Sequence, residues 1–180
     1  MSVLIEMKMD IEDKDVNYSR VLKALDSKAS HVDVGIHAFT GAELVTIASA
    51  NEFGAMAGRN RKVRIPERSF IRSTVDSNRT LYRQEGETLI NRIVDGKITQ
   101  AQGLGLLGRR VQRDIQRTIR SNVPPPNAPS TIAAKGSDHT LIDTAAMLQA
   151  VTYAVKTAQE QVVEVGEFQT GTGKAKQKRK

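Results

Sequence analysis

The stretch that decides the fold is His31-Val32-Asp33-Val34-Gly35-Ile36-His37-Ala38, in which apolar and polar side chains alternate. A period of two is that of a strand with one buried face, and it places Val32, Val34 and Ile36 on the buried side. Similar alternation before and after this stretch predicts a four-stranded antiparallel or mixed sheet, with strands near residues 3–11, 31–38, 150–157 and 160–166.

Helical periodicity fills most of the remaining chain. Pro66 suits the first turn of a helix, and Thr99 with Gln102 three residues later forms a capping-box pattern. Two stretches, 54–65 and 123–140, show no such period, and we expect them to be loops. The element order predicts an α+β fold in which helices cover one face of the sheet. The expected helices lie near residues 17–28, 41–53, 66–94, 99–121 and 141–149.

Composition favours one domain with an appended tail. The chain has 180 residues, of which 39% are hydrophobic and 4% aromatic, so a single aliphatic core over residues 1–168 is expected. It contains no Cys, which excludes disulfides and thiolate chemistry. No apolar run approaches the roughly 20 residues that span a bilayer, and Met1–Glu6 lacks the features of a signal peptide.

The net charge of +7 is concentrated at the C-terminus. Five of the 27 basic residues lie in the last seven positions, and the rest of the chain holds 22 basic and 20 acidic residues, a net charge of +2. Residues 169–180 are too polar to form a core, so we expect a disordered basic tail. Its candidate contacts with DNA phosphates are Lys174, Lys176, Lys178, Arg179 and Lys180.

The patterns that resemble catalytic or cofactor sites lack their structural context. Gly103-Leu104-Gly105-Leu106-Leu107-Gly108 fits G-x-G-x-x-G, but a helix start precedes it where a nucleotide fold requires a strand. A closely packed or flexible helix segment is therefore expected there. Gly171–Lys174 lacks the spacing of a phosphate loop. We expect neither enzymatic activity nor a bound cofactor.

Three polar residues of the deciding stretch share one face by parity, namely His31, Asp33 and His37. His31 and His37 would lie about 20 Å apart at roughly 3.3 Å per residue, so they cannot share one metal ion. We expect both histidines to face solvent and expect no metal site.

Arginines recur in two places. Arg109, Arg113, Arg117 and Arg120 follow one another at spacings of four, four and three, which makes one helical stripe with Arg110 beside it. A second group lies in the stretch Arg59–Arg64. Three interpretations stay open for both groups: a solvated face, a contact with an acidic protein surface, and a contact with nucleic acid.

Several segments in a fixed order resemble the tail-completion, or minor tail component, family of tailed bacteriophages, which are small neck proteins. The resemblance covers roughly residues 32–156. The chain departs from the family pattern at Ser69, where Pro is common, and at Ala145, where Gly is common. The segments are Val32–Ile36, Ala48–Gly54, Ile65–Arg72, Thr131–Gly136, Leu141–Thr144 and Val151–Tyr153.

Within these segments we expect Glu52-Phe53-Gly54 to end a helix, with Phe53 as its anchor. Arg68 and Arg72, four residues apart, should lie together on the first turns of the next helix and pair with Glu52 or a neighbour. Asp143 is expected to cap or brace the short helix before the last two strands.

The resemblance implies a structural virion protein that forms a ring, hexameric or dodecameric, at the head–tail interface. It implies assembly in the bacterial cytoplasm, other neck, connector or tail proteins as partners, contact with genome DNA in the lumen, and no membrane. The alternative is a nonspecific nucleic-acid-binding protein that acts through the arginine stripe and the lysine-rich tail. The candidate subunit contacts are Arg59, Arg61, Arg64, Arg68, Arg72, Arg109, Arg113, Arg117, Pro125 and Lys135.

Overall fold

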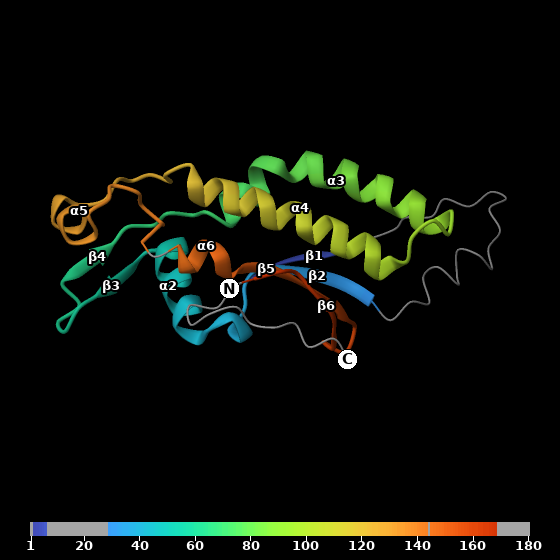
Figure 1. The fold of residues 1–180 in the computed structure, drawn as a ribbon, viewed down its shortest axis with the longest axis horizontal. Coiled ribbons are helices and arrows are strands. Elements are labelled where there is room, and N and C mark those ends of the chain that lie inside the picture. The colour runs from blue at the N-terminus through green and yellow to red at the C-terminus, as the bar shows by residue number, and fades with distance from the viewer. Residues whose placement is uncertain (1, 7–28, 144, 169–180) are drawn as a thin grey trace.

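The structure is a computed structural model that describes residues 2–6, 29–143 and 145–168. Its centre is a sheet of four antiparallel strands in the order β1-β2-β5-β6 (Figure 1). The strands are β1 (Ser2–Glu6), β2 (Ala29–Ile36), β5 (Val151–Thr157) and β6 (Val162–Val165). The predicted α+β class and its antiparallel sheet are confirmed. The expected helix 17–28 and the tail 169–180 lie outside the described residues.

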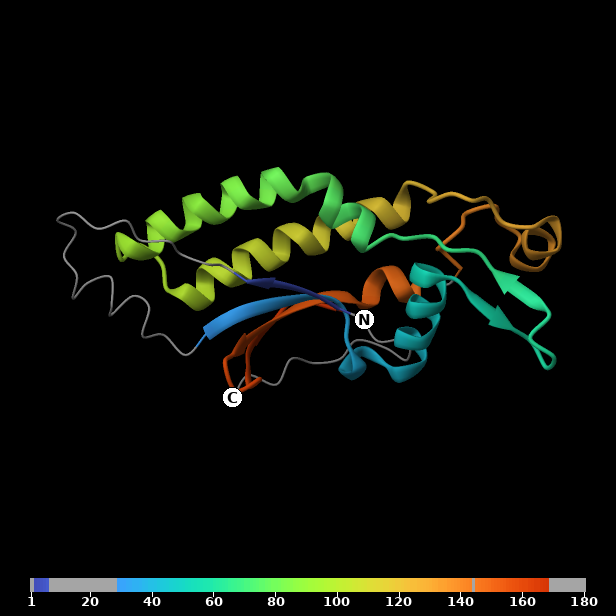
Figure 2. The same cartoon turned by 180° about the vertical axis from the view of Figure 1, so that it is seen from behind.

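Two long antiparallel helices cover one face of the sheet (Figures 1 and 2). Helix α4 (Gln100–Arg120) packs directly on β2 and β5, and α3 (Arg72–Val94) packs on α4. Helix α2 (Ala42–Phe53) follows a 3₁₀ turn, Ala38–Thr40, at one end of the sheet, and α6 (Ala146–Ala150) lies between α2 and β5. None of the described helices is long and apolar enough to cross a bilayer.

The core forms where β2 and β5 meet α4. Val32, Val34 and Ile36 are fully buried, as the alternation of β2 predicts. The facing stripe of α4 recurs at helical spacing, and Thr99 caps that helix with a complete capping box. The stripe consists of Leu104, Leu107, Val111, Ile115 and Ile119.

The glycines of the G-x-G-x-x-G pattern lie inside α4, where Gly105 and Gly108 face the sheet and Gly103 faces Ile93 of α3. A Cβ at Gly108 would lie 2.8 Å from atoms of both Tyr153 and Val32. A Cβ at Gly105 would lie 2.6 Å from the Glu164 carboxylate. These glycines let the helix backbone approach β5 and β6, which confirms the expectation of a closely packed helix segment.

Two expected helix starts and one expected helix cap are wrong. Helix α3 begins at Arg72 instead of residue 66, because the Glu52 carboxylate accepts the N–H groups of residues 70–72 and caps the helix there. Helix α6 begins at Ala146 instead of residue 141, and Asp143 is exposed and does not cap it. The residue before α6, Ala145, has φ 61°, a left-handed conformation that favours Gly.

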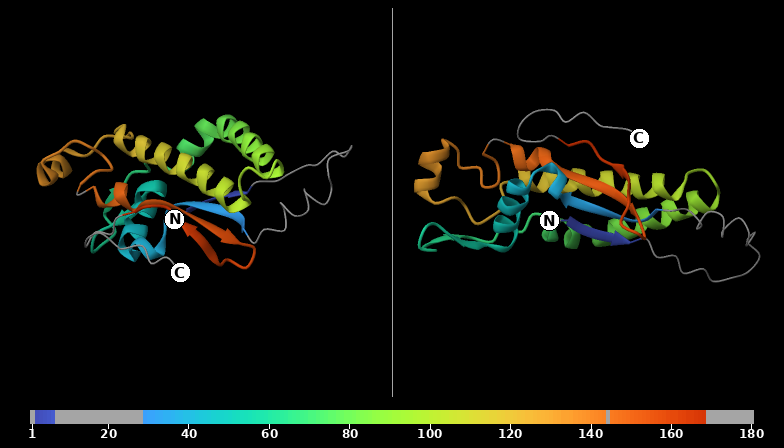
Figure 3. Two further views of the ribbon diagram at one scale, coloured as in Figure 1. Left: turned by 45° about the vertical axis from the view of Figure 1, so that its right-hand side comes forward. Right: turned by 90° about the horizontal axis from the view of Figure 1, so that it is seen from below.

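Both predicted loops contain regular structure. Residues 54–65 include a hairpin of two short strands, β3 (Ala55–Ala57) and β4 (Val63–Ile65). Residues 123–140 include a short helix, α5 (Pro129–Lys135). The hairpin and α5 project together from one end of the molecule, beyond the sheet and the two long helices (Figures 1 and 3).

We predict that Gly108→Ala lowers the free energy of unfolding by about 1–3 kcal/mol, because the added methyl overpacks the contact between α4 and β5. Gly86→Ala is the matched control, since a Cβ at Gly86 of α3 meets no atom within 4 Å. It should raise stability by about 0.5–1 kcal/mol through helix propensity. Urea unfolding followed by circular dichroism measures both changes, and equal effects would contradict the close packing of α4.

Candidate functional site

The carboxylate of Glu52 joins the end of α2 to the start of α3. Its side chain is fully buried and accepts hydrogen bonds from the backbone N–H groups of Phe70, Ile71 and Arg72 at 2.8, 2.9 and 3.0 Å. The Ser69 hydroxyl donates a further bond at 2.8 Å. A carboxylate at a helix N-terminus satisfies N–H groups that have no partner in the helix and interacts favourably with the helix dipole.

Arg72 completes this junction from outside. Its Nε lies 3.1 Å from Glu52 Oε1, and its Nη2 lies 2.6 Å from Glu67 Oε1. These hydrogen bonds, first that to Glu67, raise the pKa of Arg72. The guanidinium also lies 4.8 Å from the ring centroid of Phe53, a cation–π distance. The predicted Arg72–Glu52 pair is confirmed, whereas Phe53 is half exposed and is not the expected apolar anchor.

Arg68 is not paired with Glu52 and does not lie on a helix. It is buried in the extended segment before α3 and donates to the carbonyl oxygens of Pro125 and Pro126 at 2.8 and 3.2 Å. A third bond, at 3.3 Å, reaches Asn127 Oδ1. Asn127 in turn donates to two carbonyl oxygens of residues 138 and 139. Arg68 therefore fixes the proline-rich stretch against the start of α3, and Pro125 contributes a backbone acceptor.

The contacts of Glu52, Arg72 and Arg68 lie at the base of the hairpin β3–β4 and of α5. These two elements bury few of their own side chains. No residue of α5 is buried, and none of β3 or β4 is buried. Large apolar side chains around them are exposed, namely Ile47, Phe53, Met56 and Val63. Isolated two-stranded hairpins are marginally stable in water. The contacts of Glu52 and Arg68 therefore hold these elements at their bases, while their own apolar side chains stay exposed.

Most of the arginine stripe on α4 is held by contacts within the chain. Asp114, 4% exposed, pairs with Arg110 and with Arg117, each at 2.9 Å. Arg109 donates to the Tyr153 hydroxyl at 3.4 Å. Arg113 is exposed and makes no ion pair with a described residue. Arg109, Arg110 and Arg117 therefore belong to a structural network within the described chain, whereas Arg113 and Arg120 are exposed and outside it.

The basic group between Glu52 and Glu67 differs in this respect. Its four cations lie on or beside the hairpin and are all exposed, and no acidic residue lies among them in the sequence. Their side chains form no ion pair or hydrogen bond with the described part of the chain. These cations are Arg59, Arg61, Lys62 and Arg64.

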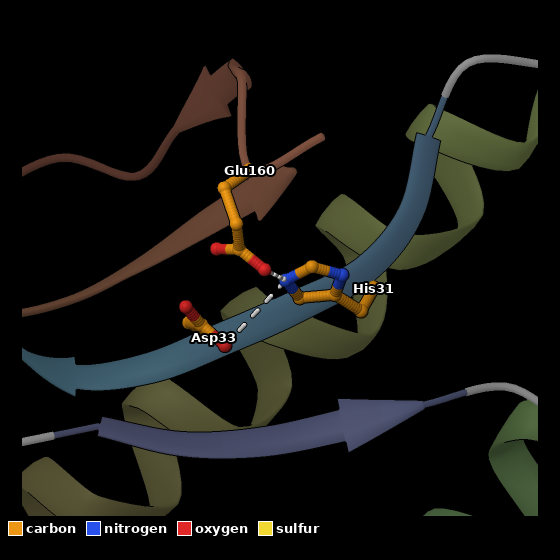
Figure 4. Close-up of side chains that lie close together, drawn as sticks. All are labelled: His31, Asp33 and Glu160. Atoms are coloured by element: carbon orange, nitrogen blue, oxygen red, sulfur yellow. Dashed lines mark ion pairs between the residues drawn. The ribbon is translucent and has the colours of Figure 1, made fainter. Parts of the chain in front are cut away.

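A second polar cluster lies near the start of β2, beside the β5–β6 turn. His31 Nε2 lies 4.0 Å from Asp33 Oδ1 and 3.5 Å from Glu160 Oε1 (Figure 4). These three side chains could hold a metal by geometry, since their ligand atoms lie within 4.8 Å of one another. However, the Lys156 ammonium lies 2.6 Å from Asp33 and 2.9 Å from Glu160 and already supplies a cation there. We interpret the cluster as an ion-pair network that fastens the β5–β6 turn to β2.

The expectation that the two histidines face solvent is wrong. His31 is 8% and His37 9% exposed. His31 lies under the β5–β6 turn, and the ring of His37 stacks on Phe39 at a centroid distance of 4.9 Å. Burial lowers the pKa of His37.

Sequence reasoning finds the arginines of this site and the pairing of Arg72 with Glu52, but it misses the partners of Arg68 and of the α4 arginines. It assigns Glu52 to a helix end without its capping role, and it does not single out Asp114 or Asn127. Only Asp114 has a usable pattern, because it lies four residues after Arg110 and three before Arg117.

Comparison of this chain with models of protein families, with curated proteins and with solved structures finds no match. The interpretation of the site therefore rests on its own geometry.

We predict that Glu52→Gln lowers the free energy of unfolding by about 2–4 kcal/mol, because an amide replaces the buried charge that accepts several hydrogen bonds. Glu67→Gln is the matched control, because it removes only the half-exposed partner of Arg72 and should change stability by less than about 1 kcal/mol. Urea unfolding measures both. Equal losses would show that Glu52 does not organise this junction.

Proposed function

We propose that this chain is a non-catalytic structural subunit of a tailed bacteriophage, a neck or tail-completion protein that forms a ring at the head–tail interface. The observation that carries the proposal is the projecting end of the molecule, where a hairpin and a helix without buried residues are held in place. Elements of this kind bury apolar surface only against a partner.

The segments that resemble the phage family support the same proposal. Four of them, far apart in the sequence, lie side by side around this projecting end (Figure 1). The backbone N–H of Arg68 donates to the Asn51 carbonyl at 2.7 Å, which joins two of these segments directly. The four segments are 48–54, 65–72, 131–136 and the described part of 141–144.

A ring also requires two different surfaces on each subunit, because a contact between identical surfaces closes after two copies. The projecting end is one such surface. The α3–α4 turn lies at the other end of the molecule, so a second, different surface can lie toward that end (Figure 2).

We predict that the purified full-length chain has a solution mass of more than two subunits, measured by light scattering after gel filtration. We also predict that the chain is present in purified virions of the phage that encodes it, as detected by mass spectrometry. A nonsense mutation should leave heads and tails unjoined in electron micrographs. A strict monomer that is absent from virions would overturn the proposal.

One observation favours a second candidate, nonspecific binding of nucleic acid. The four cations at the hairpin are exposed and unneutralised by described residues, which suits contacts with phosphates. We therefore propose the hairpin as the contact for this second candidate instead of the α4 stripe, where Asp114 pairs with Arg110 and Arg117.

Under this second candidate, replacing Arg59, Arg61 and Lys62 with Gln should weaken binding to duplex DNA in fluorescence anisotropy. The slope of log K against log salt should become less steep by about 0.9 for each phosphate that the variant no longer binds. A control that replaces the exposed Arg79, Arg113 and Arg120 removes the same formal charge. Equal weakening in the two variants would assign the effect to net charge and reject a hairpin site.

A further inference from the structure

A groove of about 740 Å³ opens at the projecting end, between the β3–β4 hairpin, α2, α6 and the chain around α5. Two of its wall residues remain open to water, with Ile47 42% and Val63 59% exposed. An occupant would therefore cover apolar surface that is wet in the single chain. The apolar side chains of the walls are Leu44, Ile47, Val63, Ile65, Leu141 and Met147.

The groove also carries positive charge. Arg68 lies in its lining, 5% exposed, and its three described hydrogen bonds go to neutral oxygens instead of a carboxylate. Burial lowers the pKa of this guanidinium. Arg64 and Lys135 add two cations, and Asp143 is the single acid among the described lining residues. A segment that is complementary to this groove would therefore carry apolar side chains for its walls and carboxylates for its cations.

The chain itself offers such a segment at the β5–β6 turn. Val162 and Val163 are adjacent and each 48% exposed, and Glu160 and Glu164 flank them. Acidic side chains gather there, complementary to the groove: Asp33 and Glu160 share the Lys156 ammonium, and His31 lies 3.5 Å from Glu160. Among the residues that the structure describes, Glu164 accepts from the Tyr153 hydroxyl, which Arg109 also contacts. Among the side chains that the structure describes, the other exposed large apolar residues away from the projecting end are Phe39, Leu81 and Leu106, which are not adjacent to one another.

We propose that the groove binds the β5–β6 end of a second copy of this chain. Val162 and Val163 then cover the apolar walls, and the flanking carboxylates face Arg64 and Lys135. The β5–β6 turn and the hairpin lie toward opposite ends of the molecule, which makes the contact intermolecular (Figures 1 and 2). The inference rests on the proposed ring and names its two surfaces, which differ from each other as a closed ring requires.

Engineered disulfides test this contact directly, because the chain has no Cys of its own. Ile47→Cys and Val163→Cys are prepared as separate full-length variants and mixed under mild oxidation. The mixture should give a disulfide-linked dimer in at least about tenfold higher yield than either variant alone, since disulfides require Cα atoms within about 7 Å. The double variant should give a ladder of covalent multimers.

A second measurement does not depend on oxidation. Val162→Ser with Val163→Ser should shift the oligomer to the monomer in gel filtration with light scattering. Leu81→Ser, at a similarly exposed apolar residue on α3, should leave the oligomer intact. Circular dichroism confirms that each variant is folded.

The outcomes separate this inference from the proposed function. An oligomeric wild-type chain that gives no Ile47–Val163 cross-link, or whose mass survives both serine substitutions, overturns the inference alone. Efficient cross-linking of the Ile47 variant with itself overturns it too, because it shows contact between two grooves. A wild-type chain that stays monomeric at every concentration overturns both.

Discussion

The hydrogen bonds to the Glu52 carboxylate fix how the projecting end meets the body of the molecule. Three backbone N–H groups, one hydroxyl and one guanidinium converge on this side chain, which has no exposure to solvent. A buried carboxylate is stable only when donors replace the water that it has lost. After the hairpin 55–65 the chain therefore returns to the end of α2, and the hydrogen bonds to Glu52 fix the position and direction of the first turn of α3. Gly54 makes the return possible, since its φ of 73° suits Gly and a Cβ would lie 3.2 Å from two backbone atoms.

Arg68 extends this constraint from the start of α3 to the loop after α4. It binds carbonyl oxygens of a stretch that contains three consecutive prolines and therefore lacks N–H groups for a regular ladder. The guanidinium supplies the donors that those carbonyls would otherwise obtain from water. Glu52 and Arg68 thus determine, from one short segment, where both the hairpin and α5 lie. A surface held in this way can meet a partner without a large loss of conformational entropy.

The sequence predicts the sheet and the long helices because their packing is periodic. The alternation of β2 and the three-four spacing of α4 each predict an apolar buried face, and the structure confirms both faces, although the polar face of β2 is buried as well. The predicted start of α3 is wrong because Pro66 satisfies a local rule, whereas the actual start depends on Glu52, which lies 20 residues before Arg72. Strands of three residues are too short to show alternation, so the sequence does not predict the β3–β4 hairpin. The histidines are misplaced because their cover comes from residues distant in sequence, such as Glu160.

The roles of the arginines in the candidate site also depend on partners that the sequence pattern does not reveal. A stripe on α4 and a group beside Gly58 look alike in sequence, since both repeat a cation every few residues. Asp114 separates them, because its buried carboxylate needs cations and two arginines of the stripe supply them. The hairpin has no such acid, so its cations remain available for an external anion. Arg64 belongs both to this group and to the lining of the groove. Cations and apolar side chains that the described residues leave exposed therefore lie together at this end of the molecule, as they do on an interaction surface.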